Sequence, residues 1–574
     1  MNISRREFLQ MLAVASAAGI QLPGQAVAKG QTAEKNLYNL PTFGNVSILH
    51  FTDCHAQLMP IWFREPNINI GIASMRGKAP HLVGEHFLAR YGLNPNTPQA
   101  HAFTYLNFVE AAKKYGKVGG FAHMATLIKH IRSQRPGSLL LDGGDTWQGS
   151  ATSLWTNGQD MVDATKLLGV DAMTGHWEFT YGADRVKEII EKDLNGHMEF
   201  LAQNIIDNQW EEDVFKPYVV KEINSVPTAI IGQAFPYTPI ANPRYMVPDW
   251  NFGIRDDKMQ KTVDAARTDG AQVVILLSHN GMDVDLKMAS RVRGIDAIMG
   301  GHTHDAVPEP IEVKNDGGTT LVINSGSNGK FLSVLDFDVR KGKIRGYRYS
   351  LLPIFSNLLE PDTAMAAHIS KVRKPFKAEL EEELGVADEL LYRRGNFNGS
   401  FDQLILDALI DAQDADIAFS PGFRWGISVL PGEAITFDHV MTQTAITYPT
   451  VTLNQTTGED IKLILEDVAD NLFNTDPYYQ QGGDMVRVGG LKFSIDPTKT
   501  IGKRITDMEV NGKPLEANKK YRVAGWASVA ARREGRPVWD VVADYIRKQD
   551  TVKVNKLNIP KIKGLKNNPG LAEI

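Results

Sequence analysis

Histidine and aspartate residues follow five short apolar segments of this sequence. The segments 46–51, 138–141, 171–174, 273–277 and 295–299 lead into TDCH, DGGD, GHWE, SHN and GGHTHD. A single His or Asp after a strand is usually a cap or a turn residue. Several such strand ends in one chain, two of them with D-x-H or H-x-H spacing, are hard to obtain by chance. They indicate a site that holds metal ions.

The D-x-H and H-x-H spacings predict which side chains converge. In an extended segment, side chains two positions apart project to the same side. Asp53 and His55 can therefore send two ligands to one place, and so can His302 and His304. Imidazole mixed with carboxylate suits manganese, iron or zinc rather than calcium. Two such metals about 3.5–4 Å apart form a hydrolytic centre.

Alternating strand and helix patterns span residues 46 to 345 and must position these side chains. Helical patterns such as GFAHMATLIKHIR, DMVDATKLLG and DKMQKTVDAARTDG separate the apolar segments. This order indicates a layered α/β domain, and ligand sites in such sheets form at the carboxyl ends of strands. The segment 56–118 interrupts the first unit and is long for a loop, which predicts a functional or independently structured insertion. We expect it to border the site.

The length of 574 residues predicts two domains or more. Residues 356–388 are expected to form a charged connecting helix, and residues 389–560 a second domain with the helix FDQLILDALIDAQ and the strand-like TAITYPTVTLNQTTG. Cys54 is the single cysteine, which excludes an intrachain disulfide. The net charge of −5 argues against a nucleic-acid partner.

Residues 1–28 have the pattern of an export signal. Arg5 and Arg6 precede an apolar run at 11–20 and an A-x-A cleavage site at 26–28. The paired arginines are typical of twin-arginine export. The apolar run is shorter than the ~20 residues that a membrane-spanning helix needs. We therefore expect a periplasmic mature protein without a membrane anchor.

The order D-x-H, G-G-D, G-H-W-E, S-H and G-H-x-H resembles that of the calcineurin-like metallophosphoesterases. The two-domain layout resembles their 5′-nucleotidase branch. Within that branch, TDCHAQL, GHWEFTYG and PGFRWG are similar to the SoxB family, the sulfate-releasing thiol hydrolases of the Sox sulfur-oxidation system. The resemblance implies an α/β fold: a four-layer sandwich domain over 40–355, with helices around two packed mixed sheets, and then an α/β 5′-nucleotidase-like substrate domain.

The resemblance also implies two divalent metal ions, with manganese as the expected metal, although manganese, iron and zinc share these ligand types. His176 stands where the family has a ligating Asn, and imidazole can take that role. The alternative for His176 is a hydrogen-bonded turn histidine. The implied ligands are Asp53, His55 and His304 for the first ion, His279, His302 and His176 for the second, and Asp145 as the bridge.

Trp177 and Thr180 stand where the nucleotidases carry their catalytic His and the Asp that orients it. The alkoxide of a phosphate ester is a poor leaving group that benefits from an acid, whereas a persulfide leaves at far lower pKa. The departure fits attack by metal-bound hydroxide on a thiosulfonate. In the SoxB family that group sits on a cysteine of the carrier protein SoxY, in the SoxYZ pair. The alternative for Trp177 is plain packing.

The second domain is expected to supply substrate contacts. Arg424, in FSPGFRWGIS, lies in a loop similar to the nucleotidases' anion-binding loop, and a guanidinium fork suits a sulfonate. Tyr479 and Arg487, in YYQQGGDMVRVGG, are further candidates for substrate binding, with Arg487 alternatively structural. The residues expected to act in catalysis are Asp145, His176, Trp177 and Arg424.

Two other functions remain open. One is a periplasmic 5′-nucleotidase or related phosphoesterase. The nucleotidases' Gly-Gly-Asp-Gly-like loop is not recognisable in ASVAARREGRPVWD, which weakens that interpretation. The other is a non-catalytic carrier-binding module that keeps a structural metal pair.

Overall fold

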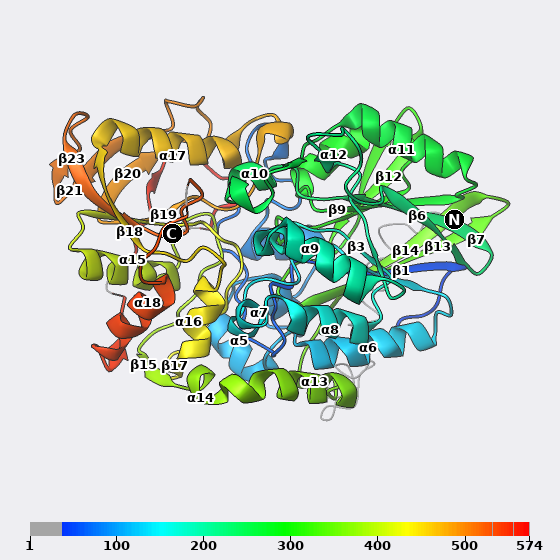
Figure 1. Ribbon diagram of the computed structural model, residues 1–574, viewed down its shortest axis with the longest axis horizontal. Coiled ribbons are helices and arrows are strands. Elements are labelled where there is room, and N and C mark those ends of the chain that lie inside the picture. Colours follow the sequence, from blue (N-terminus) through cyan, green and yellow to red (C-terminus); the bar gives the residue numbers. More distant parts are fainter. Residues whose placement is uncertain (1–36, 531, 555, 573–574) are drawn as a thin grey trace, which may run out of the picture.

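The chain forms two domains that lie side by side, the first on the right of Figure 1 and the second on the left. This is a computed structural model, and it describes residues 37–530, 532–554 and 556–572. The export signal predicted at 1–28 lies outside the described residues. Among those residues, none of the helices combines the length and the apolar character needed to cross a membrane.

Two six-stranded mixed sheets form the middle of the first domain. The first sheet has the order β14-β13-β1-β2-β3-β4 and the second β11-β12-β10-β9-β7-β6. The strands of the first are β1 (Val46–Phe51), β2 (Leu139–Asp142), β3 (Ala172–Met173), β4 (Glu199–Phe200), β13 (Phe331–Arg340) and β14 (Lys343–Pro353). Those of the second are β6 (Tyr218–Ile223), β7 (Val226–Gln233), β9 (Val273–Ser278), β10 (Ala297–Gly300), β11 (Ile311–Asn315) and β12 (Gly318–Asn324).

The β9 sequence VVILLS shows how the layers form. Side chains alternate across a strand, so Ile275 and Leu277 join the core between the two sheets, while Val274 and Leu276 pack on the outer helices. Those helices are α11 (Asp256–Thr268) and α12 (Met282–Arg291). On the first sheet the outer layer consists of α6 (Phe121–Ser133) and α8 (Gln159–Leu168), and α13 (Thr363–Arg373) packs against these two helices. The expected four-layer sandwich is confirmed.

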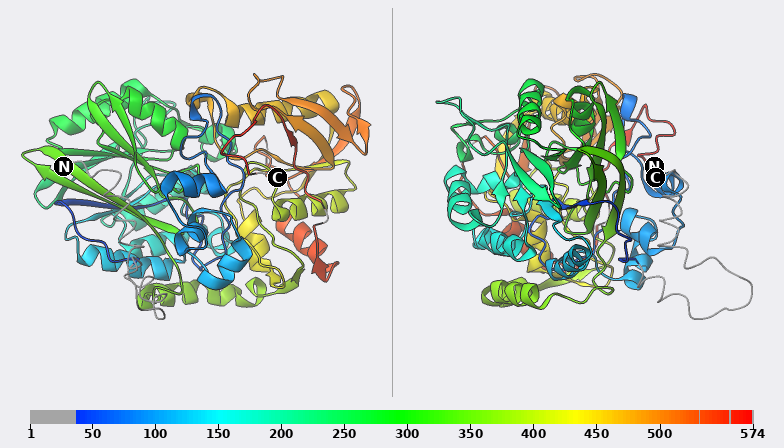
Figure 2. Two further views of the ribbon diagram at one scale, coloured as in Figure 1. Left: turned by 180° about the vertical axis from the view of Figure 1, so that it is seen from behind. Right: turned by 90° about the vertical axis from the view of Figure 1, so that its right-hand side faces the viewer.

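The insertion at 56–118 is structured, and Figure 2 shows its helices at the boundary between the domains. It holds α3 (Gly84–Tyr91), α4 (Pro98–Phe103) and α5 (Phe108–Tyr115). Phe87 and Phe103 bury their rings in the first-domain core. The C-terminal segment returns to the insertion, because Asn568 Nδ2 donates to Gly71 O (2.9 Å). The chain after residue 560, where the second domain was expected to end, therefore contacts the insertion of the first domain.

Three small sheets and four helices make up the described second domain. The sheets have the orders β18-β23-β16-β19, β22-β21-β20-β25 and β17-β15-β24. The helices are α15 (Ser400–Gln413), α16 (Phe437–Thr444), α17 (Gly458–Phe473) and α18 (Val538–Arg547). The strands are β15 (Glu383–Ala387), β16 (Ile417–Ser420), β17 (Ala434–Thr436), β18 (Thr452–Thr457), β19 (Arg487–Gly489), β20 (Leu491–Ile495), β21 (Ile505–Val510), β22 (Lys513–Pro514), β23 (Lys520–Gly525), β24 (Thr551–Val552) and β25 (Lys561–Ile562).

The connecting helix expected at 356–388 is not continuous. Pro375 interrupts it after α13, as a proline does when it removes a backbone donor. The chain then forms the short α14 (Lys377–Leu380) and enters β15, which pairs with β17 and β24. The second domain therefore begins near residue 383, earlier than expected. Of the strand-like TAITYPTVTLNQTTG, only β18 is a strand.

Candidate metal centre

The seven predicted metal ligands lie together where the two sheets of the first domain face each other. Strands β1, β2 and β3 are parallel in one sheet, and β9 and β10 are parallel in the other. The loops at their carboxyl ends carry two groups whose potential ligand atoms lie within 4.8 Å of one another. The groups are Asp53, His55, Asp145 and His304, and Asp145, His176, His279 and His302. This is the grouping expected from the sequence, with Asp145 shared.

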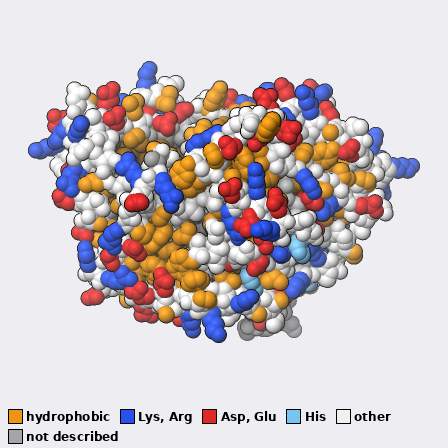
Figure 3. Space-filling view, in the orientation of Figure 1, with side chains coloured by type: hydrophobic (Ala, Val, Ile, Leu, Met, Phe, Trp, Pro, Cys, Tyr) orange, Lys and Arg blue, Asp and Glu red, His pale blue; other side chains and the backbone are white. Residues whose placement is uncertain are grey.

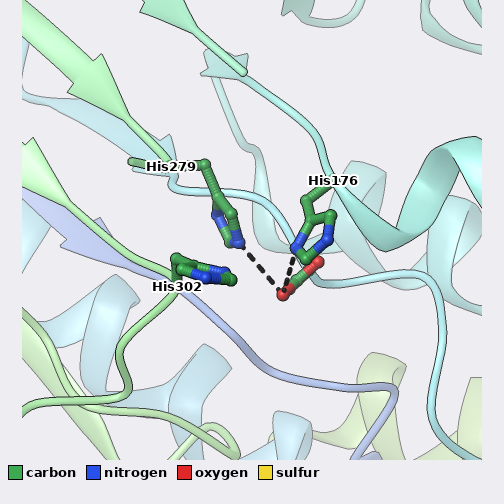
Figure 4. Close-up of side chains that lie close together, drawn as sticks. His176, His279 and His302 are labelled. Carbon is green, nitrogen blue, oxygen red and sulfur yellow. Dashed lines mark hydrogen bonds and ion pairs between the residues drawn. The ribbon is translucent and has the colours of Figure 1, made fainter. Parts of the chain in front are cut away.

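Two imidazoles of the second group point at one carboxylate oxygen (Figure 4). His176 Nδ1 lies 3.2 Å and His279 Nε2 3.0 Å from Asp145 Oδ2. His279 uses its other nitrogen, Nδ1, on Gly143 O at 2.6 Å. A hydrogen bond from one ring nitrogen to a carbonyl leaves the other nitrogen free to bind a metal.

In the first group, too, ring nitrogens lie close to carboxylate oxygens. His304 Nε2 lies 3.3 Å from Asp53 Oδ1 and 3.1 Å from His55 Nε2. His55 Nε2 lies 3.6 Å from Asp145 Oδ2. Nitrogen and oxygen atoms thus converge from all four residues on one point, which is the arrangement a cation requires.

The burial and the charges of the cluster are suited to binding divalent metal ions. Burial lowers the pKa of His302 and His304 well below its usual range and that of His55 to about 3, so these rings are neutral and offer lone pairs. His279 differs. Burial opposes its charge, but Asp145 and Asp53 outweigh burial and raise its pKa to about 10. The two carboxylates therefore attract positive charge, and this donor set suits manganese, iron or zinc.

The ligand loops are not extended, which corrects the geometry assumed from the D-x-H and H-x-H spacing. Asp53, His55, Asp145, His302 and His304 have φ angles of 52°, 45°, 57°, 72° and 58°. Non-glycine residues rarely adopt this left-handed region, and such strain gathers at functional sites. Both members of each pair still reach the cluster.

Close backbone approach explains the glycines of the ligand motifs. A Cβ on Gly301 would overlap Thr52 and come within 3.0 Å of Asp53 Oδ2. A Cβ on Gly143 would overlap Thr52 as well. The G-G-D and G-G-H-T-H loops can therefore meet only if these positions carry no side chain.

Glu178 ties two ligand loops together. Its carboxylate accepts hydrogen bonds from the backbone N–H groups of Asp145 (3.2 Å), Thr146 (2.7 Å), Trp147 (3.2 Å) and His176 (2.8 Å). A buried carboxylate with four donors holds its loops firmly.

Trp177 belongs to an aromatic wall that both domains build beside the metal centre. Trp425 stacks on His55 with ring centroids 4.6 Å apart, and Trp177 meets Phe423 at 5.1 Å. Tyr448 lies parallel to Trp177, at 3° and 6.2 Å. Sequence reasoning missed Phe423, Trp425 and Tyr448. The aromatic residues on either side of Arg424 were the available signal.

Arg424 contacts the ligand-bearing loop directly. Its Nη1 donates to Thr303 O (2.7 Å), between the two histidines of G-H-T-H, and its Nη2 donates to Gly483 O (2.5 Å). Its Nε lies 3.4 Å from Asp484 Oδ1. The side chain also lines a hollow together with His81 of the insertion. The insertion therefore borders the site, as expected.

Arg487 is held inside the second domain, and Tyr479 lies at the surface. Arg487 is fully buried, with Nη2 3.1 Å from Asp484, Nε 3.2 Å from Asp402 and Nη1 donating to Gly395 O at 2.9 Å. Its guanidinium is occupied within the second domain, which corrects the expected substrate contact in favour of the structural alternative. Tyr479 is 67% exposed on the surface.

Comparisons with known proteins agree with this geometry. The model of the 5′-nucleotidase C-terminal domain family matches residues 384–543. The 5′-nucleotidase of Rattus norvegicus is 26% identical over 71% of this chain and 76% of its own length, and the snake venom 5′-nucleotidase of Naja atra is 27% identical over 73% and 85%.

Two solved structures, both of proteins from Thermus thermophilus, extend the comparison to the whole fold. The sulfate thiohydrolase SoxB, in complex with glycerol, superposes with a TM-score of 0.87 and 36% identity, covering 92% of this chain and 98% of that one. A 5′-nucleotidase precursor shares the fold, with a TM-score of 0.71 and 20% identity over 90% and 99%. With a ligand cluster at the strand ends and an aromatic wall above it, this chain belongs to the SoxB family within the 5′-nucleotidase branch of the metallophosphoesterases.

Proposed function

We propose that this chain releases sulfate from a thiosulfonate on a carrier-protein cysteine, SoxY of the SoxYZ pair, in periplasmic thiosulfate oxidation. The observation that carries the proposal is the pair Trp177 and Thr180. Trp177 is only 6% exposed and packs on Trp425, and Thr180 Oγ1 donates to Trp177 O (2.7 Å). Neither side chain can donate a proton to an alkoxide. The 36% identity to a sulfate thiohydrolase supports the same substrate class.

The reaction needs no protonated leaving group. Water attacks the terminal sulfur, and the bond between this sulfur and the carrier's sulfane sulfur breaks. The electron pair of that bond stays on the carrier as a persulfide anion, while the attacked sulfur departs as sulfate and water gives up its protons. A persulfide is a far weaker base than an alkoxide, so acid catalysis contributes little.

The two ligand groups would hold a pair of divalent ions, for which we expect manganese. Such a pair lowers the pKa of water and draws charge from the oxygens of the group under attack. Asp145 lies between the two sites, and Glu178 fixes the loops of Asp145 and His176. The Trp177–Trp425 wall excludes bulk water from the reacting sulfur.

The domain boundary offers room for a protein substrate. A solvent-open groove runs past Thr180, Tyr181 and Tyr448, and Tyr448 lies parallel to Trp177 of the aromatic wall. Figure 3 shows apolar side chains gathered on this side of the molecule, over α16. Such gatherings mark protein contact sites.

The insertion is the second element that we assign to the carrier. Asn69 and His81 line the hollow beside Arg424, and a short 3₁₀ helix, Ala73–Met75, lies between them in the sequence. Replacing residues 73–79 with a short glycine linker should slow turnover of the carrier and leave the metal content unchanged. Unchanged carrier turnover would remove the insertion from the docking surface.

One experiment separates the three candidate functions. The purified, manganese-loaded protein is given thiosulfonated carrier and, separately, AMP, while sulfate and phosphate are measured. Sulfate without phosphate is expected. Efficient phosphate release would favour the 5′-nucleotidase, an alternative that the relatives at 26% and 27% identity keep open. Carrier binding without either product would favour the non-catalytic module.

A further inference from the structure

We propose that the Gln481–Gly483 loop of the second domain is a positioning element of the second metal site. On this view the site is complete only when the second domain rests on the first. The inference relies on the metal pair of the proposed function, but not on its substrate.

The Gln481–Gly483 loop reaches a metal-centre histidine through its backbone. His302 Nε2 donates to Gln481 O at 3.0 Å. A carbonyl can only accept, so the proton lies on Nε2 and the lone pair on Nδ1. A hydrogen bond of this kind sets the tautomer and the ring orientation of a ligating histidine. Here it comes from the other domain.

The same loop is fastened to the segment that carries two of the ligands. Arg424 donates to Gly483 O (2.5 Å) and to Thr303 O (2.7 Å), so one guanidinium joins the loop to the backbone between the histidines of G-H-T-H. Asp484 follows the loop, and its N–H donates to Gly422 O (2.9 Å). The Asp484 carboxylate lies 3.1 Å from Arg487. The residues that directly follow Gln481 are thus held in place by contacts with Arg424, Gly422 and Arg487.

Two adjacent glycines in the loop share a backbone conformation but differ in what an added side chain would meet. Gly482 and Gly483 have φ angles of 74° and 75°, so replacement of either carries a similar backbone penalty. A Cβ on Gly482 would collide with His302 Nε2. A Cβ on Gly483 would find its nearest neighbour, Gly422 O, at 3.7 Å. Gly482→Ala and Gly483→Ala are therefore a matched pair.

The test compares metal binding in these two variants. Each protein is stripped, equilibrated with Mn²⁺ and analysed for metal per chain, and the weaker site is titrated against a chelator. Gly482→Ala should bind the second ion about 10- to 100-fold more weakly, as expected when the support of a ligating histidine is lost. Gly483→Ala should lose far less affinity, because its Cβ meets no atom of the metal centre. Equal metal affinity in the two variants would overturn the proposal.

Two further measurements keep the result interpretable. The melting temperature of stripped Gly483→Ala should fall by the backbone penalty alone, and that of stripped Gly482→Ala should fall at least as far, because its Cβ also meets His302. If Gly482→Ala does not fold, hydrogen exchange on the unaltered protein replaces it. Amides of residues 480–484 should gain protection as the weaker site fills with Mn²⁺. Protection that stays constant through the titration would refute the proposal.

The outcome is independent of the reaction. A protein that binds two ions through this loop but releases no sulfate would sustain the inference and reject the proposed function. If the parent releases sulfate while Gly482→Ala keeps full metal affinity, the proposed function would stand and the inference about the loop would fall.

Discussion

Trp177 and Trp425 meet edge to face, with ring centroids 4.8 Å apart and planes at 78°, although they belong to different domains. Trp425 in turn stacks on His55 of the metal centre. An apolar wall thus stands over the ligand cluster where a phosphoesterase would place an acid. We therefore expect the ligand cluster, and not a general acid, to carry the chemistry of this site.

His176 should contribute to the second metal site. Its Nδ1 faces Asp145 Oδ2 at 3.2 Å, beside His279. His176→Ala should reduce bound metal below that of the parent, measured by elemental analysis of folded protein. His176→Asn is the matched control, because an amide oxygen can still ligate, and it should retain more metal than the alanine variant. Full occupancy of both sites in His176→Ala would show that His176 is a turn residue.

Arg424 should support turnover through the contacts it makes. Losing charge-assisted hydrogen bonds typically costs about 1.5–3 kcal/mol, so Arg424→Ala should lower kcat/KM by about tenfold or more. Arg424→Lys keeps the charge but loses the planar fork whose two nitrogens reach Thr303 O and Gly483 O. It should therefore recover only part of the activity. Parental kinetics in both variants would refute a role for this side chain.

The pair of His81 and Asp283 should make stability depend on pH. Their side chains meet at 3.0 Å. Burial lowers the pKa of His81, but Asp283, aided by Asp305 and opposed by Arg424, raises it above the usual 6.5. The folded state thus holds this proton more tightly than the unfolded chain. The resulting stabilisation is complete below about pH 6.5 and is lost as the pH rises through the raised pKa.

Urea unfolding measures this effect. His81→Gln should lower the free energy of unfolding more at about pH 6 than at about pH 9. Asp283→Asn should show the same dependence, because it removes the other half of the pair. A difference from the parent that is constant with pH would contradict the assignment.

The sequence predicted the ligand cluster because the ends of strands can be recognised from the local sequence pattern. Asp53 and His302 each follow a short apolar run, and parallel strands bring such ends to one edge. The left-handed backbone at these residues was not visible, because several residue types can adopt it when the surrounding structure imposes it. Trp425 and Gln481 were missed because their role arises from packing between domains. Local patterns carry no information about that contact.

Trp177 and Thr180 should mark a site that does not protonate its leaving group. The parent, loaded with metal, should barely hydrolyse AMP. The double change Trp177→His with Thr180→Asp should restore acid help, which is worth about 10²–10⁴-fold. Its gain should be larger for esters with poor leaving groups than for activated esters, because acid help matters most where the leaving group is worst. Release of sulfate from the carrier should stay level or fall, since a persulfide departs unprotonated.

Single changes provide the controls for this pair. Trp177→His alone should raise phosphate-ester hydrolysis less than the double change does, because Thr180 cannot orient the new imidazole. Trp177→Phe preserves an aromatic ring against Trp425 and should leave AMP hydrolysis low, which separates the new acid from simple opening of the wall. The decisive measurement is the parent's own kcat/KM for AMP. If the parent already cleaves AMP efficiently, another residue supplies the proton, and Trp177 serves only to pack the two domains together.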